Sequence, residues 1–324
     1  MTTILLSRSD IAALMRPADY IAAVEEGFRA AKEGRASAPA PLHLECPRGG
    51  FHAKGATLSG PRGYAALKLN GNFPGNPGQG LPTIRGALLL CDAADGALLA
   101  VMDSGEVTLQ RTAAATALAA RHLARADSRT VAIIGCGEQA GAQLAALREV
   151  LPLERCLACD RDAGRAHAFA RRDHGIECLA VPELGEATGS ADVIVTVTTS
   201  QEPVLHGSHV RSGTFIAAVG ADSPHKHEIG AGLMAASRVV VDVLEQCLAM
   251  GDLRHAVAAG AMTAADVHGD LGDLVAGARA GRSGDAETWI FDSTGTALQD
   301  VAAAAAIYER ALAAGSGTPF VFDR

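Results

Sequence analysis

The fold is decided by one stretch of the chain, Thr130-Val-Ala-Ile-Ile-Gly-Cys-Gly-Glu-Gln-Ala140. Its apolar half, residues 131–134, is unbroken, as in a parallel strand that is buried on both faces. The Gly-x-Gly-x-x-Ala segment that follows is typical of a phosphate-binding turn. Gly135 permits the tight turn, Gly137 has no side chain to hold a pyrophosphate away, and Ala140 lets the next helix pack closely on the strand. An ordinary strand–loop–helix crossover is the alternative.

The helix predicted after this turn, residues 139–150, would direct unpaired N–H groups and a positive dipole end towards phosphates. Glu138 and Gln139 therefore join the two glycines as candidate cofactor contacts. A second strand, residues 155–159, ends in Asp160, about 20 residues further on, where a carboxylate can accept hydrogen bonds from ribose hydroxyls. Asp160 would repel a 2′-phosphate, whereas the adjacent Arg161 could receive one, so we expect NAD with tolerance of NADP.

The composition excludes several classes of protein. A chain of 324 residues with 48% hydrophobic and 20% charged residues is globular and about two domains long. Its net charge of −8, with no basic stripe, argues against nucleic acid and anionic membranes as partners. The N-terminus lacks an export signal and no apolar run approaches about 20 residues, so we expect a cytoplasmic location. Seven scattered cysteines indicate reduced thiols, and no metal site is predicted because no ligand cluster supports one.

Two regions of the chain differ in their pattern. From Thr130 onwards strands and helices alternate, with six strands predicted, which indicates an α/β fold with a doubly wound parallel sheet of the Rossmann type. The first region carries a helix at 17–32, a hairpin signal at Asp95-Gly96, and the pattern of an antiparallel α+β domain. A terminal helix at 296–314 is too alanine-rich to be stable alone and is expected to pack on the first domain. We therefore predict a Rossmann dinucleotide-binding domain at 119–296 and a discontinuous α+β domain at 1–118 and 297–324. The strands are predicted at 42–46, 50–56, 64–69, 85–91 and 98–103 in the first region, and at 130–134, 155–159, 177–180, 192–198, 214–219 and 238–243 in the second.

Lys68 is the first candidate for chemistry outside the nucleotide site. It interrupts an apolar strand, and strand alternation places it on the same face as Ala66. A buried lysine is costly without a partner. Either this face is solvated, or the cation is held against an anionic or electron-rich substrate.

Arg111 is the second candidate. Thr108 resembles an N-cap, so Arg111 is expected in the first turn of an alanine-rich helix, where a cation opposes the helix dipole. Helix stability does not explain such a residue, but an arginine beside free N–H groups can grip both oxygens of a carboxylate.

Asp222 follows the fifth strand of the predicted parallel sheet, at the edge where ligands bind in such sheets. An acid there is either a general acid–base or a loop cap, and its position alone does not decide between them. The residues after the fourth strand, Thr198, Thr199 and Ser200, are expected to border the nicotinamide, unless they only cap the turn. The remaining candidate cofactor contacts are Val219 and Thr112.

The chain resembles the ornithine cyclodeaminase/mu-crystallin family over essentially its whole length. The matching segments, in order, are 67–74 (LKLNGNFP), 81–86 (LPTIRG), 102–104 (MDS), 109–114 (LQRTAA), 134–139 (IGCGEQ), 219–222 (VGAD), 270–273 (DLGD) and 291–300 (FDSTGTALQD).

The resemblance implies a homodimer, makes the discontinuous domain at 1–118 and 297–324 the substrate-binding and dimerisation domain, and assigns roles to the candidate residues. Lys68 and Arg111 correspond to the cations that face the substrate carboxylate and imine, and Asp222 corresponds to the acid–base that handles the substrate amine. Mu-crystallins lack this aspartate, so its presence favours catalysis. Cyclodeaminases carry a further arginine shortly before the Lys68 strand, which is absent from residues 40–42 here. Lys54 is expected to replace it as a second carboxylate contact, which weakens the case for ornithine.

We therefore expect hydride transfer between a nicotinamide and the α-carbon of a small amino or imino acid. The leading reaction is reduction of Δ1-pyrroline-2-carboxylate to proline, with Asp222 and Lys68 as catalytic residues and Arg111 holding the carboxylate. An ornithine cyclodeaminase and an alanine-type dehydrogenase are the alternatives within the family. A mu-crystallin-like protein that binds NADPH and a small ligand without turnover is the alternative of another class.

Overall fold

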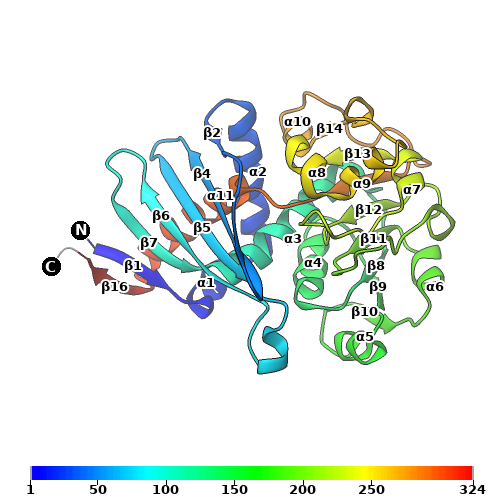
Figure 1. Ribbon diagram of the computed structural model, residues 1–324, viewed down its shortest axis with the longest axis horizontal. Coiled ribbons are helices and arrows are strands. Elements are labelled where there is room, and N and C mark those ends of the chain that lie inside the picture. Colours follow the sequence, from blue (N-terminus) through cyan, green and yellow to red (C-terminus); the bar gives the residue numbers. More distant parts are fainter. Residues whose placement is uncertain (1, 323–324) are drawn as a thin grey trace. The chain divides into compact units, whose positions relative to one another are not determined.

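The computed structural model describes residues 2–322 and divides into two compact units (Figure 1). Unit 1 comprises residues 1–111 and 296–324, and unit 2 comprises residues 112–295. The first boundary falls inside one continuous helix, α3 (Ser104–Leu123), which therefore contributes residues to both units. Within residues 2–322, no helix is both long enough and apolar enough to cross a bilayer.

Unit 1 is built on a mixed sheet in the order β16-β1-β7-β6-β5-β4-β2, with β3 also paired to β4. The strands β1 and β7 are parallel, and the antiparallel β6–β7 hairpin turns at Gly96, whose φ of 79° is the left-handed conformation that glycine tolerates. The five predicted strands and this hairpin are present. The strands β1, β2 and β16 were not predicted, because they are short segments without a clear alternation. The bounds are β1 Thr2–Leu6, β2 Ala36–Ser37, β3 Leu42–Cys46, β4 Gly49–Leu58, β5 Tyr64–Asn72, β6 Ile84–Asp92, β7 Leu98–Asp103 and β16 Thr318–Val321.

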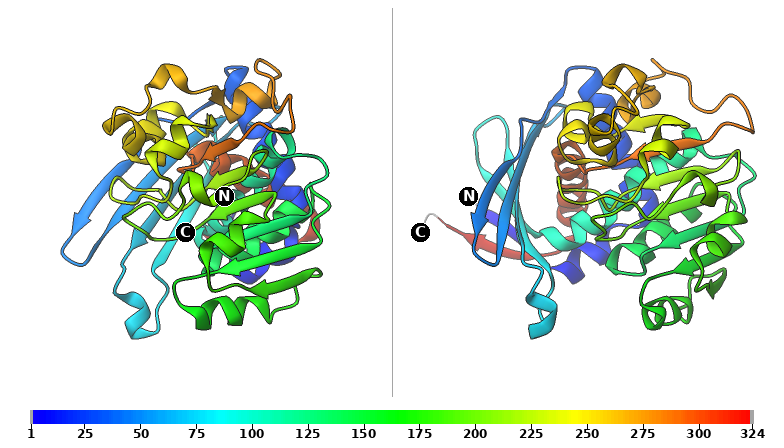
Figure 2. Two further views of the ribbon diagram at one scale, coloured as in Figure 1. Left: turned by 90° about the vertical axis from the view of Figure 1, so that its right-hand side faces the viewer. Right: turned by 45° about the vertical axis from the view of Figure 1, so that its right-hand side comes forward.

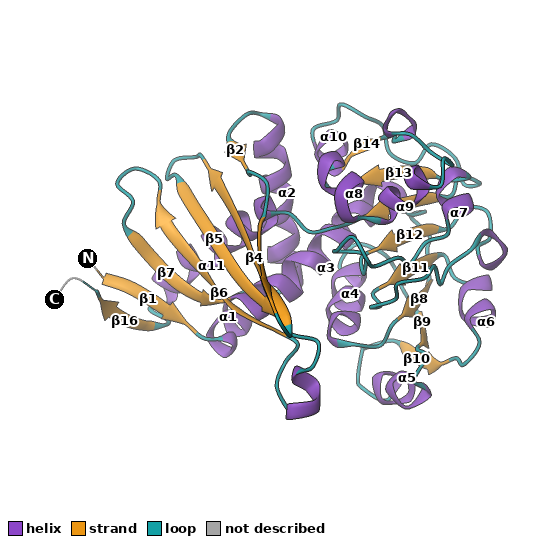
Figure 3. Cartoon of the chain, viewed as in Figure 1, coloured by secondary structure: helices purple, strands orange, loops and turns teal. Residues whose placement is uncertain are grey.

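Three helices complete unit 1: α1 (Arg8–Leu14), α2 (Pro17–Lys32) and α11 (Ala297–Ala314). The terminal helix α11 packs on β4, β5 and α2, as predicted for a helix that is not stable alone (Figures 2 and 3). Gly27 allows the close approach of the two helices, since a Cβ at this position would lie 2.9 Å from the carbonyl oxygen of Leu298. The last 29 residues of the chain therefore complete a unit that begins at its N-terminus.

Unit 2 contains an eight-stranded sheet in the order β10-β9-β8-β11-β12-β15-β13-β14, with every pairing parallel. The Rossmann-type parallel sheet is confirmed. The six-strand prediction was wrong in number, since β14 and β15 were missed. The strand β15 has only four residues and lies far along the chain from its neighbours β12 and β13. The bounds are β8 Thr130–Ile134, β9 Arg155–Cys159, β10 Glu177–Ala180, β11 Val193–Thr196, β12 Phe215–Ala218, β13 Arg238–Val241, β14 Gly269–Asp270 and β15 Trp289–Asp292.

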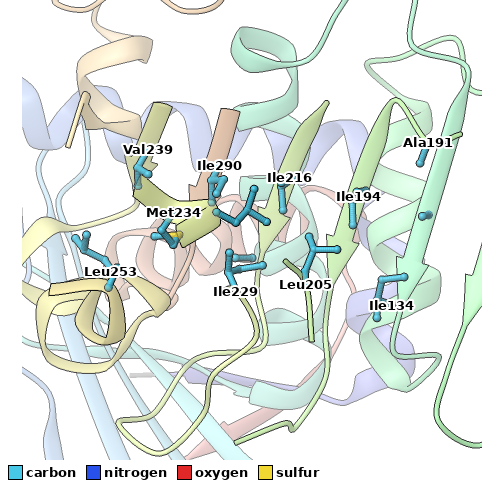
Figure 4. Packing of buried hydrophobic residues seen from close by; sticks show 14 of the residues in the cluster. Ile134, Ala191, Ile194, Leu205, Ile216, Ile229, Met234, Val239, Leu253 and Ile290 are labelled. Atoms are coloured by element: carbon cyan, nitrogen blue, oxygen red, sulfur yellow. The ribbon is translucent and has the colours of Figure 1, made fainter. Parts of the chain in front are cut away.

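The helices of unit 2 are short, and buried aliphatic side chains fill the space between them and the sheet (Figure 4). Residues from strands far apart in the sequence meet in this core, such as Ile134, Ile216 and Ile290, each at most 5% exposed. Burial on both faces explains why these strands read as continuous apolar runs. The helix bounds are α4 Glu138–Arg148, α5 Ala163–Ala170, α6 Leu184–Gly189, α7 Ala231–Ala235, α8 Leu244–Met250, α9 Asp252–Ala258 and α10 Leu271–Val275.

Candidate active site

The glycine turn lies at the point where the strand order of unit 2 reverses, between β8 and β11. Gly135 has φ of 97°, and its N–H donates to the carbonyl of Cys159 at 2.8 Å. A Cβ there would lie 2.9 Å from the carbonyl oxygen of Val197, so the position requires glycine. A Cβ at Gly137 would meet nothing within 4 Å, which leaves the start of α4 open to a ligand. This arrangement fits a pyrophosphate at a helix N-terminus.

Asp160 stands at the carboxyl end of β9, beside the same turn. One of its carboxylate oxygens accepts from the N–H of Cys136 at 2.7 Å, and the other accepts from the N–H of Asp162 at 2.8 Å. The carboxylate therefore braces the glycine turn, and its remaining lone pairs can still accept from ribose hydroxyls. Arg161 is exposed next to it. These residues fit an adenine dinucleotide, and α4 begins with the two remaining candidates, Glu138 and Gln139.

The ends of β11 and β12 are tied together by Glu228, a residue that the sequence did not suggest. Its side chain is fully buried and accepts from the Thr196 hydroxyl at 2.7 Å, from the Thr198 N–H at 2.6 Å and from the Gly220 N–H at 2.7 Å. Burial raises the pKa of Glu228, and these hydrogen bonds oppose the rise. The segments that hold Val219, Thr199 and Ser200 are thus fixed by one carboxyl group. No composition signal marks such a residue, because its role depends on contacts with segments 30 residues away.

Asp222 lies in the loop after β12, at the edge of the sheet where the sequence placed it. Its carboxylate is 46% exposed and pairs with the ammonium of Lys226 at 2.5 Å. The loop is anchored further by a hydrogen bond from the N–H of His227 to the carbonyl of Ser200 at 2.9 Å. An acid in an anchored loop with access to solvent can exchange protons, as a general acid–base must.

Lys68 and Arg111 lie together in unit 1. The Lys68 side chain is 4% exposed, so of the two readings left open by the sequence the solvated face is excluded, whereas the neighbouring Leu67 and Leu69 point outwards. Its ammonium donates to Asp300 at 2.8 Å and to the Thr108 hydroxyl at 3.2 Å. Lys54 lies directly opposite Lys68 on β4, on the same face of the sheet.

The predicted helix start near Arg111 was wrong. The helix α3 begins at Ser104, where the Asp103 carboxylate caps it by accepting the N–H of Glu106 at 2.8 Å. Thr108 is therefore inside the helix, and Arg111 lies in its second turn, away from the free N–H groups. Binding of an anion by Arg111 would therefore depend on its guanidinium alone and not on the helix dipole. The next residue of α3, Thr112, is buried in unit 2.

One carboxylate, Asp300, joins both cations. The Arg111 Nε donates to the same Asp300 oxygen as Lys68, at 2.9 Å, and the Arg111 Nη1 donates to Gln299 at 2.6 Å. Burial acts to raise the pKa of Asp300, but Lys68 and Arg111 together hold it below its ordinary value. Burial lowers the pKa of Lys68 to about 7, although Asp300 opposes this shift. Asp300 and Gln299 were not predicted as site residues, although they lie in the segment 291–300, which is part of the family resemblance.

A family model for the ornithine cyclodeaminase/mu-crystallin family matches residues 1–315. The chain belongs to this family. An alanine dehydrogenase of Archaeoglobus fulgidus is 40% identical over 326 residues, covering 100% of both chains. The family prediction from the sequence is therefore confirmed.

Solved structures agree with this assignment. An archaeal alanine dehydrogenase dimer with bound NAD matches with a TM-score of 0.95 at 40% identity, covering 99% of this chain and 100% of that chain. A Δ1-pyrroline-2-carboxylate reductase of Thermococcus litoralis, in complex with NADH and L-proline, matches with a TM-score of 0.95 at 34% identity, covering 98% of this chain and 99% of that chain. These two relatives are thus a dehydrogenase and a reductase, each solved with a nicotinamide cofactor.

Proposed function

We propose that this chain reduces a small cyclic imino acid, Δ1-pyrroline-2-carboxylate, to proline with a nicotinamide cofactor. That it is an NAD(P)-dependent oxidoreductase of its family agrees with relatives crystallised with NAD and NADH. The observation that carries the substrate proposal is the buried cluster of Lys68, Arg111 and Asp300, in which two cations share one anion. Its net charge of +1, the sum of two positive charges and one negative charge, matches a single substrate carboxylate.

The residues of the proposed site have separate roles in this reaction. Arg111 and Lys68 hold the substrate carboxylate and fix the orientation of the ring. Asp222, which is open to solvent, takes a proton from water and passes it to the imine nitrogen, which makes the neighbouring carbon electrophilic. The glycine turn and Asp160 would hold the dinucleotide, which supplies the hydride when it is bound. Lys226 keeps the carboxylate of Asp222 in place before the proton is transferred.

An alanine-type dehydrogenase is the second candidate, because the 40% identity to the Archaeoglobus fulgidus enzyme extends over the whole chain. The two activities differ in the nitrogen donor. The cyclic imine carries its own nitrogen, whereas pyruvate reduction to alanine requires ammonia. Ornithine conversion to proline with catalytic NAD tests the cyclodeaminase alternative.

The experiment compares NADH and NADPH oxidation with the cyclic imine and with pyruvate plus ammonia, for the wild type and Asp222→Asn. We expect faster oxidation with the cyclic imine, loss of turnover in Asp222→Asn and near-normal cofactor affinity in that variant. Asp127→Asn is the matched control, since this aspartate is 79% exposed in the same unit. Turnover that survives in Asp222→Asn would remove this residue from the mechanism. Cofactor binding without turnover of any amino or imino acid would support a mu-crystallin-like binding protein.

We also propose that the chain forms a homodimer through the outer face of the unit 1 sheet. Leucines gather on this face, opposite the side that α11 covers: Leu42, Leu44, Leu67 and Leu69 are 57%, 50%, 48% and 43% exposed. Such an exposed apolar face is unusual for a monomer. A second copy of the chain is the occupant we propose, because the archaeal alanine dehydrogenase of the same fold is a dimer.

A further inference from the structure

Asp300 is the one anion in the buried cluster that it forms with Lys68 and Arg111. It lies in the first turn of α11, 232 residues from Lys68 and 189 residues from Arg111, and it is 1% exposed. One of its oxygens accepts from both cations, at 2.8 Å and 2.9 Å. A single atom therefore sets the separation of the two groups that we assign to the substrate carboxylate.

The charges around Lys68 come from three elements. Asp300 faces it from α11, Arg111 from α3, and Lys54 from the adjacent strand β4. Arg111 and Lys54 disfavour the ammonium by repulsion, and burial disfavours it by removing water, so Asp300 is the one of these charges that favours the protonated lysine. Without this carboxylate, Lys68 would become largely neutral at neutral pH and would no longer attract an anion.

Two polar atoms of the cluster still lack a partner. Within residues 2–322, the second carboxylate oxygen of Asp300 and the amide nitrogen of Gln299 are buried without a hydrogen bond. The amide nitrogen is a donor, and a substrate carboxylate oxygen is the kind of acceptor that it needs. The cluster therefore has the unsatisfied groups of a site that is completed by a ligand.

We propose that Asp300 is a positioning residue for the substrate: it fixes Lys68 and Arg111 at a common oxygen and favours the charged form of the Lys68 side chain. The role of Asp300 in substrate binding rests on the proposed function. Its physical core, the control of the lysine charge by Asp300, is independent of any substrate.

The experiment measures the charge of Lys68 directly. The chain has only four lysines, at positions 32, 54, 68 and 226, so a protein labelled with 13C at the lysine ε-carbon gives few NMR signals. The Lys68 signal is the one that disappears in Lys68→Arg. We expect this signal to titrate near neutral pH in the wild type and about 1–3 pH units lower in Asp300→Asn, the range expected for loss of an adjacent opposite charge. An unchanged or higher midpoint in Asp300→Asn would overturn the proposal.

Kinetics then connect the charge of Lys68 to the substrate. In the wild type, kcat/KM for the imine should fall as the pH rises through the Lys68 midpoint, and in Asp300→Asn this fall should move to lower pH, mainly through KM. Lys68→Arg in the Asp300→Asn background should restore binding at high pH, since guanidinium stays charged. Asp19→Asn, in α2 of the same unit, controls for a general loss of stability and should leave the pH profile in place.

The outcomes separate the two proposals. An NMR midpoint that moves as expected supports the inference even if the wild type has no turnover, in which case the proposed function fails alone. A kinetic profile that does not move, with turnover present, overturns the positioning role. If Asp300→Asn does not fold, the wild type and Lys68→Arg decide the matter: the fall of kcat/KM at high pH should be absent in Lys68→Arg, and its persistence would count against the proposal.

Discussion

Replacing Lys68 with methionine should separate the stability of the protein from its activity. The cluster holds two cations and one carboxylate, so Lys68→Met leaves Arg111 and Asp300 as a one-to-one pair. Methionine fills a similar volume without a charge to bury, and volume-conserving changes usually cost less than about 1.5 kcal/mol. Removal of Asp300 would instead leave two buried cations unpaired, at a cost of about 3–5 kcal/mol.

The free energies of unfolding should therefore rank the variants clearly. In urea denaturation, Lys68→Met should lose no more than about 1 kcal/mol, whereas Asp300→Leu should lose about 3–5 kcal/mol. In steady-state kinetics with the imine, Lys68→Met should lose about 10²- to 10³-fold in kcat/KM, since a buried charge pair to substrate contributes about 2–5 kcal/mol. The reasoning is refuted if Lys68→Met is as unstable as Asp300→Leu, or if it retains wild-type kcat/KM.

Three further variants test other parts of the structure. Asp160→Ala should weaken NAD binding by roughly 10- to 100-fold and weaken NADP binding less, because the lost carboxylate accepts from ribose hydroxyls but repels a 2′-phosphate. Fluorescence titration with both cofactors checks this, with Asp162→Ala as the control. Leu69→Asp should convert the dimer to a monomer in light scattering, whereas Leu179→Asp, 44% exposed on β10 of unit 2, should not; equal behaviour of the two would contradict the proposed interface. Asp252→Asn should preserve stability at neutral pH. Burial, together with the neighbouring Asp292 and Glu228, raises the pKa of Asp252 well above its ordinary value, so folding disfavours the charged carboxylate that Asn cannot form. The wild type should therefore lose stability as the pH rises above the ordinary pKa of an aspartate. In urea unfolding near pH 5 and near pH 8, the free energy of unfolding should fall less towards the higher pH in Asp252→Asn than in the wild type; a larger fall in the variant would contradict the sign.

The sequence predicts what depends on local pattern. The Rossmann sheet, the glycine turn and the helix at 17–32 all follow from periodicity and from residue types that have one main use, whereas the sequence left open whether Lys68 is buried. The family resemblance, confirmed by the comparisons, added the activity class and directed attention to Asp222, whose role position alone left open. Those residues were identified because each lies in a recognisable segment.

What the sequence could not predict depends on contacts between distant segments. Glu228 lies in a stretch without a motif, and Asp300 lies in a family segment that gives it no role; each becomes important only because donors from other elements converge on it. The start of α3 was misplaced because Thr108 is a good N-cap residue, whereas the cap is Asp103, at the end of a strand. The strand β15 was missed because it follows a loop, residues 276–288, and not a helix of the alternating pattern from which equally short strands such as β10 were predicted.

The position of β15 has a consequence for how the protein is made. This strand, residues 289–292, inserts between β12 and β13, and α11 comes immediately after it to cover the sheet that starts at residue 2. Neither unit can close its core until the chain has been synthesised through residues 289–314. Nascent chains should therefore remain sensitive to proteases late into synthesis, and deletions near the C-terminus should unravel the nucleotide-binding sheet and the α+β unit together.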